Sequence, residues 1–187
     1  MLFVLLTLSL CLPALAGTEG DWQAVKSKIL QSRDYCFRYQ YKGPSGQYRF
    51  SYAYRAPGLI RAEILPGSQR HSGTVVLYDS ARSTDYVTVR SGMIQLRRST
   101  RSKDVADTSL ITPLLHQILG KVEACGVPSL SRLEGLQLYE FKGAQQHQLW
   151  VDEQKDVRRY RVSEGGKTVE ELEFEPISWN TGVVPAL

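Results

Sequence analysis

The strongest constraint on this sequence is a stretch of alternating aromatic residues between Tyr35 and Ile64. Every second residue is aromatic in two successive runs, the first made of Tyr35, Phe37, Tyr39 and Tyr41 and the second of Tyr48, Phe50, Tyr52 and Tyr54. The turn-forming residues 43–46 (GPSG) separate the runs. Because side chains alternate between the two faces of a strand, this pattern predicts a β-hairpin with all of its large rings on one side. Such a surface must be covered by the protein or by an apolar ligand.

The chain begins with an uncharged apolar run that ends in Ala14, Leu15 and Ala16. An apolar segment followed by a small-x-small site is typical of a secretory signal peptide, although the usual basic residue near the start is missing. The run is too short to cross a bilayer as a helix. We therefore expect residues 1–16 to be a signal peptide and residues 17–187 to form one exported domain. The alternative is a lipid-modified start at Cys11, but Leu10 stands where such a signal needs a small residue.

The net charge of +4 over 187 residues is too small to indicate a nucleic-acid-binding protein. Basic residues gather in the run 97–103 (RRSTRSK). Such a run is most simply a solvated loop, and its functional alternative is a contact for an acidic partner or for lipid headgroups.

Once the signal is removed, two cysteines remain, Cys36 and Cys125. An even pair in an exported protein favours one disulfide, and the alternative is two free thiols. The three histidines are scattered without metal-ligand spacing, and the sequence has neither a Gly-x-Ser-x-Gly motif nor a phosphate-binding glycine loop. We therefore expect no metal, no cofactor and no enzymatic activity. The acidic pairs in residues 170–175 are expected to lie on a solvated face.

Two segments show helical periodicity. The first is a helix that begins after the N-cap candidate Asp21 and ends near Arg33. Its apolar stripe consists of Trp22, Val25, Ile29 and Leu30. The second covers residues 107–125, where Thr112 or Asp107 can cap the helix and the apolar band is broad enough to press into a concavity. This band has two rows, one with Leu110, Leu114, Ile118 and Val122 and the other with Ile111, Leu115 and Leu119.

The remaining segments read as strands separated by short turns. These segments are 59–65, 74–79, 86–89, 93–96, 136–141, 146–151, 157–162 and 168–174. Many antiparallel strands and few helices predict an α+β fold with a strongly curved antiparallel sheet, an open half-barrel of about 9–11 strands. Two or more helices are expected to cover its concave face.

Several short motifs resemble those of the LolA/LolB-like superfamily of periplasmic lipoprotein carriers and receptors. They are the mid-chain apolar helix and the segments 54–63, 76–79, 149–152 and 174–180. The resemblance implies a periplasmic protein in which an open barrel, lidded by helices, accepts acyl chains. Two positions differ from the carriers: Ala56 stands where an arginine precedes the proline, and Ile60 stands where the family has an aromatic residue.

On this resemblance, the concave face and the second helix would line an apolar cavity. The candidate ligand-binding residues are Phe37, Tyr39, Phe50, Tyr52, Leu59, Ile60, Leu77, Leu114, Leu115 and Ile118. Ile111 is not assigned to the cavity. The alternative is that the same residues form an ordinary core.

The expected function is that of a monomeric carrier or chaperone for a lipid or an acylated protein. The alternative is a sensor or assembly module that binds an envelope protein. Nucleic acid is not an expected partner.

Overall fold

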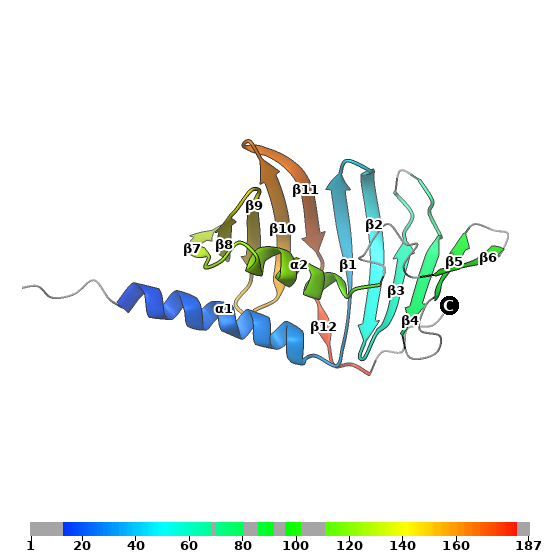
Figure 1. Ribbon diagram of the computed structural model, residues 1–187, viewed down its shortest axis with the longest axis horizontal. Coiled ribbons are helices and arrows are strands. Elements are labelled where there is room, and N and C mark those ends of the chain that lie inside the picture. Colours follow the sequence, from blue (N-terminus) through cyan, green and yellow to red (C-terminus); the bar gives the residue numbers. More distant parts are fainter. Residues whose placement is uncertain (1–12, 69, 81–85, 92–95, 102–110, 183–187) are drawn as a thin grey trace, which may run out of the picture.

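The computed structural model describes residues 13–68, 70–80, 86–91, 96–101 and 111–182. It forms one antiparallel sheet whose concave face is covered by two helices, α1 (Pro13–Gln31) and α2 (Leu114–Glu123) (Figure 1). The predicted α+β fold with a curved, unclosed sheet is confirmed.

The described strands form a 12-stranded sheet in which chain neighbours mostly lie side by side. From one edge to the other the order is β6-β5-β4-β3-β2-β1-β11-β10-β9-β8-β7, and β12 pairs with β1 beyond the end of β11. The strands are β1 (Asp34–Gly43), β2 (Gly46–Arg55), β3 (Leu59–Ile64), β4 (Val75–Asp79), β5 (Tyr86–Ser91), β6 (Leu96–Arg101), β7 (Ser129–Leu133), β8 (Leu136–Lys142), β9 (Gln146–Val151), β10 (Val157–Glu164), β11 (Lys167–Phe174) and β12 (Ser178–Trp179).

The aromatic hairpin is built as its alternation predicts. The two rows meet as direct cross-strand pairs: Tyr35 with Tyr54, Phe37 with Tyr52, Tyr39 with Phe50, and Tyr41 with Tyr48. The ring centroids of Tyr39 and Phe50 are 4.8 Å apart and nearly parallel. We call these eight residues the aromatic wall. It lies at the centre of the sheet, where β1 also pairs with β11.

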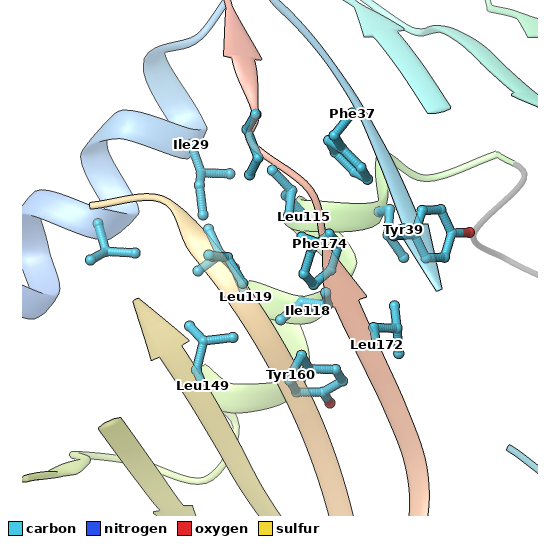
Figure 2. Packing of buried hydrophobic residues seen from close by; sticks show 14 of the residues in the cluster. Ile29, Phe37, Tyr39, Leu115, Ile118, Leu119, Leu149, Tyr160, Leu172 and Phe174 are labelled. Atoms are coloured by element: carbon cyan, nitrogen blue, oxygen red, sulfur yellow. The ribbon is translucent and has the colours of Figure 1, made fainter. Parts of the chain in front are cut away.

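Both helices turn their apolar side chains toward the sheet. Trp22, Val25 and Ile29 of α1 are buried as predicted, whereas Leu30, which was assigned to the same apolar stripe, is 58% exposed and lies off the buried face. In α2 the buried residues are Leu114, Leu115, Ile118, Leu119 and Val122. Figure 2 shows Leu115, Ile118 and Leu119 packed between the wall residue Phe37 and residues of the later strands.

Both helix boundaries differ from the expectation. Helix α1 begins at Pro13 rather than after an N-cap at Asp21, whose carboxylate accepts a hydrogen bond from Lys155 instead. Helix α2 begins after Pro113, which supplies no side-chain cap. The predicted start of the second helix at residues 107–110 lies outside the described residues.

Other local expectations also need correction. The basic run is not only a loop, because its first part forms β6, which pairs with β5 at the edge of the sheet. Residues 93–95 of the expected 93–96 strand lie outside the described part of the chain. Strand β7 was not predicted. It pairs with β8 through a turn in which Glu134 and Gly135 both have positive φ, and its side chains are largely exposed.

Candidate functional site

The aromatic wall is divided into a closed half and an open half. Phe37 and Tyr52 are 5% and 2% exposed, because α2 and its neighbours cover them. At the other end of the hairpin, Tyr41, Tyr48 and Phe50 are only partly buried. The protein therefore covers its apolar wall incompletely.

A cavity of about 660 Å³ lies over the open half. We call it the inner cavity. It is enclosed by the central strands and by α2, and its lining residues are Tyr39, Tyr41, Ser45, Tyr48, Phe50, Ala62, Ile64, His71, Val76, Leu114, Gln117, Ile118, Lys121, Tyr160, Glu170 and Leu172. This volume lies within the roughly 300–1,000 Å³ range of small-molecule sites.

Four predicted site residues line the inner cavity: Tyr39, Phe50, Leu114 and Ile118. Four others, Phe37, Tyr52, Ile60 and Leu115, are buried in the core cluster instead. Directly paired residues of an antiparallel ladder lie on the same face. Because Ile60 pairs with Tyr54, its neighbour Leu59 lies on the opposite face, as does Leu77, which pairs with Arg61. Leu59 and Leu77 therefore do not line the cavity.

Sequence reasoning assigned none of the other lining residues to the site. Tyr41 and Tyr48 belong to the same alternating rows as Tyr39 and Phe50, so this signal was present. Ile64 faces the cavity because it pairs with Phe50. Tyr160, Glu170 and Leu172 come from β10 and β11, and the long-range pairing of β11 with β1 brings them to the hairpin.

One end of the inner cavity is polar. Tyr160 lies in a buried hydrogen bond with His147, with 2.8 Å between its hydroxyl and Nδ1. Burial is the main cause that raises the pKa of Tyr160 above its usual range. The pKa of His147 is lowered by burial and by the Lys121 ammonium, against the opposing effect of Glu170. Both groups are therefore expected to be neutral near pH 7.

Helix α2 is anchored to the wall through its first turn. The backbone N–H of Leu114 donates a buried hydrogen bond of 2.9 Å to the hydroxyl of Tyr52. The imidazole Nε2 of His116 lies 3.4 Å from the carbonyl oxygen of Ile29 in α1. These contacts and the buried apolar face fix α2 over the closed half of the wall.

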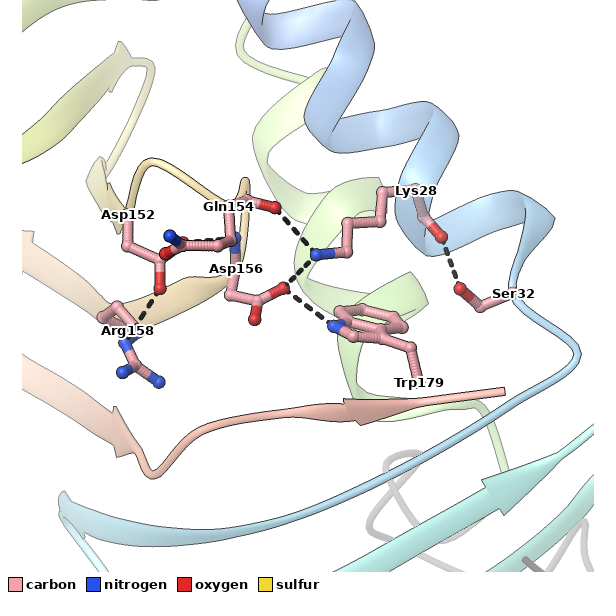
Figure 3. Close-up of polar contacts among 7 residues, drawn as sticks. All are labelled: Lys28, Ser32, Asp152, Gln154, Asp156, Arg158 and Trp179. Carbon is pink, nitrogen blue, oxygen red and sulfur yellow. Dashed lines mark hydrogen bonds and ion pairs between the residues drawn. The ribbon is translucent and has the colours of Figure 1, made fainter. Parts of the chain in front are cut away.

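Helix α1 is tied to the sheet by a polar cluster around Asp156 (Figure 3). Lys28 donates to the Asp156 carboxylate and, at 2.7 Å, to the carbonyl oxygen of Gln154. The indole N–H of Trp179 donates to the same carboxylate at 2.7 Å. The Lys28 ammonium also lies 5.1 Å from the centroid of the Trp179 ring. The cluster joins α1, the β9–β10 turn and β12.

The predicted disulfide is wrong, because both Cys36 and Cys125 are free. Cys36 lies between the buried residues Tyr35 and Phe37 on β1, so its side chain faces the outer side of the sheet. Cys125 follows α2 on the concave side, where its Sγ lies beside Gly143. The sheet itself separates the two thiols.

A second concavity of about 890 Å³ lies at the opposite end of the hairpin. Its lining is mostly polar and has no aromatic residue: Gln31, Arg33, Asp34, Arg55, Ala56, Pro57, Asn180 and Gly182. Within the described part of the chain, no group of three or more His, Cys, Asp or Glu residues is placed to hold a metal ion. Neither described helix has the length and apolar character of a membrane span. The inner cavity is therefore the candidate ligand site.

Comparison with solved structures gives matches over most of the chain. An uncharacterized conserved protein from Thermus thermophilus is 12% identical and has a TM-score of 0.53, with coverage of 85% of this chain and 87% of that chain. The Mycobacterium tuberculosis lipoprotein LppX is 12% identical and has a TM-score of 0.52, with coverage of 90% of this chain and 98% of that chain. A LolA superfamily protein from Nitrosomonas europaea is 11% identical and has a TM-score of 0.41, with coverage of 90% of this chain and 94% of that chain.

The chain shares its fold with LppX and with the Thermus thermophilus protein. The fold that the sequence resemblance implied, an open curved sheet with helices on its concave face, is therefore confirmed. No family model and no curated protein sequence matches the chain. In this fold, the inner cavity lies between the concave face of the sheet and α2.

Proposed function

We propose that this protein is an exported carrier that binds the acyl chain of a lipid or of an acylated protein in the inner cavity. The observation that supports this proposal best is the open half of the aromatic wall. Tyr48, Phe50 and Ile64 are only partly buried and present apolar surface to a cavity of about 660 Å³. An ordinary core would have filled that space, because protein interiors are close-packed.

Affinity comes from the removal of apolar surface from water. Burying a hydrocarbon chain is favourable by about 25 cal/mol for each Å² of apolar area. The lining offers such contacts on two opposite sides, from the rings of β1 and β2 and from Leu114 and Ile118 of α2. An extended chain that lies between these surfaces is shielded along its length.

Entry and release do not require α2 to leave the sheet. Its residues Leu115, Leu119 and Val122 are buried in the core, and its first turn is bonded to Tyr52. The partly buried rings Tyr41 and Tyr48 instead stand near the hairpin turn at the free end of the cavity. The acyl chain therefore enters from the side of the β1–β2 turn while α2 stays in place.

The test compares two charged substitutions on one strand. Ile64 and Leu59 are both partly buried residues of β3, but only Ile64 faces the inner cavity. Ile64→Glu should weaken binding of a fluorescent fatty acid by tenfold or more, about 1.4 kcal/mol, because a carboxylate then faces the hydrocarbon chain. Leu59→Glu is the matched control and should bind like the wild type.

Circular dichroism should first show that Ile64→Glu is folded. If the folded variant binds the fatty acid as tightly as the wild type does, the proposal is contradicted. Leu115 is unsuitable for this test, since its side chain is fully buried and a glutamate there would unfold the core. Native mass spectrometry of the gently purified protein gives a second measurement. Co-purified lipid supports a carrier, whereas a stoichiometric protein partner favours an assembly module.

The proposal includes export through residues 1–16 and a location in the cell envelope. Cleavage after Ala16 would remove Pro13–Ala16 from α1 and leave its buried residues Trp22, Val25 and Ile29 in place. Mass spectrometry of the secreted chain should find an N-terminus at Gly17. An intact Met1 on protein recovered from the envelope would contradict this part of the proposal.

A further inference from the structure

Glu170 is an acidic residue on the apolar side of the sheet. On β11 the inner positions alternate with outer ones, and the inner neighbours of Glu170 are the buried residues Leu172 and Phe174. Its cross-strand partner Val162 is also buried. The other acidic residues of this strand, Glu171 and Glu173, take the outer positions and pair with arginines of β10. Glu170 alone among these places a carboxylate at the lining of the inner cavity.

Lys121 of α2 faces this carboxylate across the cavity. The distance between Nζ and the nearest Glu170 oxygen is 3.8 Å, longer than the roughly 2.7–2.9 Å of a charge-assisted hydrogen bond. Among the described residues, neither the Lys121 ammonium nor the Glu170 carboxylate takes part in a hydrogen bond. The two groups therefore form a long ion pair at the cavity lining, and neither uses its hydrogen-bonding capacity on another described residue.

Lys121 and Glu170 lie at the boundary between the apolar cavity and solvent. The side chains of Lys121 and Glu170 are 41% and 28% exposed. Tyr160 lines the cavity beside them, and its hydroxyl is already bonded to the buried His147. The two charges are therefore the groups at this end of the cavity that remain available to a polar ligand head.

We infer that the end of the inner cavity formed by Lys121 and Glu170 binds the zwitterionic head of a lipid, with the phosphate at Lys121 and a primary ammonium at Glu170. This inference rests on the proposed function, because the acyl chain occupies the apolar part of the same cavity. A head with both charges satisfies both residues, whereas a purely anionic head meets the Glu170 carboxylate without a compensating cation. The ligand class is that of phosphoethanolamine lipids.

The experiment measures binding of two lysophospholipids with the same acyl chain, one with a phosphoethanolamine head and one with a phosphoglycerol head. The wild-type protein should bind the phosphoethanolamine lipid about five- to tenfold more tightly. Glu170→Gln should abolish this preference by strengthening binding of the anionic lipid relative to the zwitterionic one. Lys121→Gln should weaken binding of both lipids.

Glu173→Gln is the matched control. Glu173 lies on the same strand but on the outer face, in an ion pair of similar length with Arg159 at 3.7 Å. This variant should keep the wild-type preference. Free phosphoethanolamine, which carries the head without the chain, should not displace the lipid at equal concentration, and displacement would overturn the inference that the head binds as part of a lipid.

Two outcomes separate this inference from the proposed function. Equal binding of both lipids by the wild type, or an unchanged preference in Glu170→Gln, overturns the headgroup assignment and leaves the acyl cavity standing. Failure of the wild type to bind either lipid or the fluorescent fatty acid overturns the proposed function, and the headgroup assignment with it.

Discussion

The backbone N–H of Leu114 donates a hydrogen bond to the hydroxyl of Tyr52, so the first turn of α2 is held by the aromatic wall that it covers. The first N–H groups of a helix have no partner within the helix. Pro113 precedes α2 without a side-chain cap. A tyrosine that is distant in sequence therefore takes the place of the usual N-cap residue.

Tyr52→Phe should lower the free energy of unfolding by about 1–2 kcal/mol, because the Leu114 N–H then stays buried without its acceptor. Urea denaturation measures this change, and hydrogen exchange should show faster exchange in the first turn of α2. The control is Tyr48→Phe, which removes a hydroxyl that donates to the exposed Ser45 carbonyl group. That variant should stay within about 0.5 kcal/mol of the wild type. Equal losses in the two variants would contradict the anchoring role of Tyr52.

Asp156→Ala should lower the free energy of unfolding by about 2 kcal/mol, since the Trp179 indole loses its acceptor and Lys28 loses its charged partner, keeping only the Gln154 carbonyl oxygen. The matched control is Glu123→Ala, which removes the other acidic partner of an α1 lysine, Lys26. The Glu123 side chain is 45% exposed, so this ion pair should contribute at most about 1 kcal/mol. Thermal and urea unfolding of both variants give the comparison. A larger effect at Glu123 would show that Asp156 does not hold α1 on the sheet.

The free thiols predict that reducing agents leave stability unchanged. Loss of a native disulfide typically costs about 2–5 kcal/mol. The urea midpoint should be the same with and without dithiothreitol, because Cys36 and Cys125 lie on opposite sides of the sheet. Both thiols should react with a maleimide after unfolding without prior reduction. A reductant-dependent midpoint would contradict the structure at this point.

Stability should fall as the pH drops from about 7 to 5. Burial is the main cause that lowers the pKa values of His116 and His147 from the ordinary value of 6.5. Below about pH 6.5 the unfolded chain therefore binds protons that the folded chain does not yet bind, and the free energy of unfolding decreases. Well above about pH 6.5 both histidines are neutral in the folded and the unfolded chain, so this loss of stability is absent there.

The variant His147→Gln should reduce the slope of stability against pH in this window, as measured by urea unfolding at pH 7.5, 6.5 and 5.5. Its control, His71→Gln, changes an exposed side chain and should keep the wild-type slope. A slope in His147→Gln equal to that of the wild type would rule out His147 as a source of the pH dependence.

Local patterns in the sequence predicted the hairpin and most strands correctly. The alternation of rings is a property of neighbouring residues, so it needs no knowledge of the rest of the chain. Strand β9 has the predicted limits, and β8, β10 and β11 extend the predicted segments by one or two residues. Strand β7 was not recognised because its residues are largely exposed and form no clear alternation.

The assignment of residues to the cavity was less successful. Leu59 and Ile60 are adjacent, and only the pairing of Ile60 with Tyr54 decides which of them faces inward. The acidic run of β11 read as a solvated face, yet Glu170 lies on the inner side. Glu170 keeps the alternation of the buried residues Leu172 and Phe174, so the signal was present in the sequence, but a charged side chain is seldom expected on the inner face of a sheet.

The sequence by itself determined the aromatic wall and the apolar face of α2, because each follows from the spacing of side chains along one element. The succession of many short strands with few helices also indicated the curved antiparallel fold. Only the tertiary structure decided that α2 covers half of the wall, that Tyr160, Glu170 and Leu172 complete a cavity over the other half, and that the sheet separates the two thiols. The physical reason is that strand register and helix position are set by contacts between segments distant in the chain. Periodicity within a single segment carries no record of those contacts.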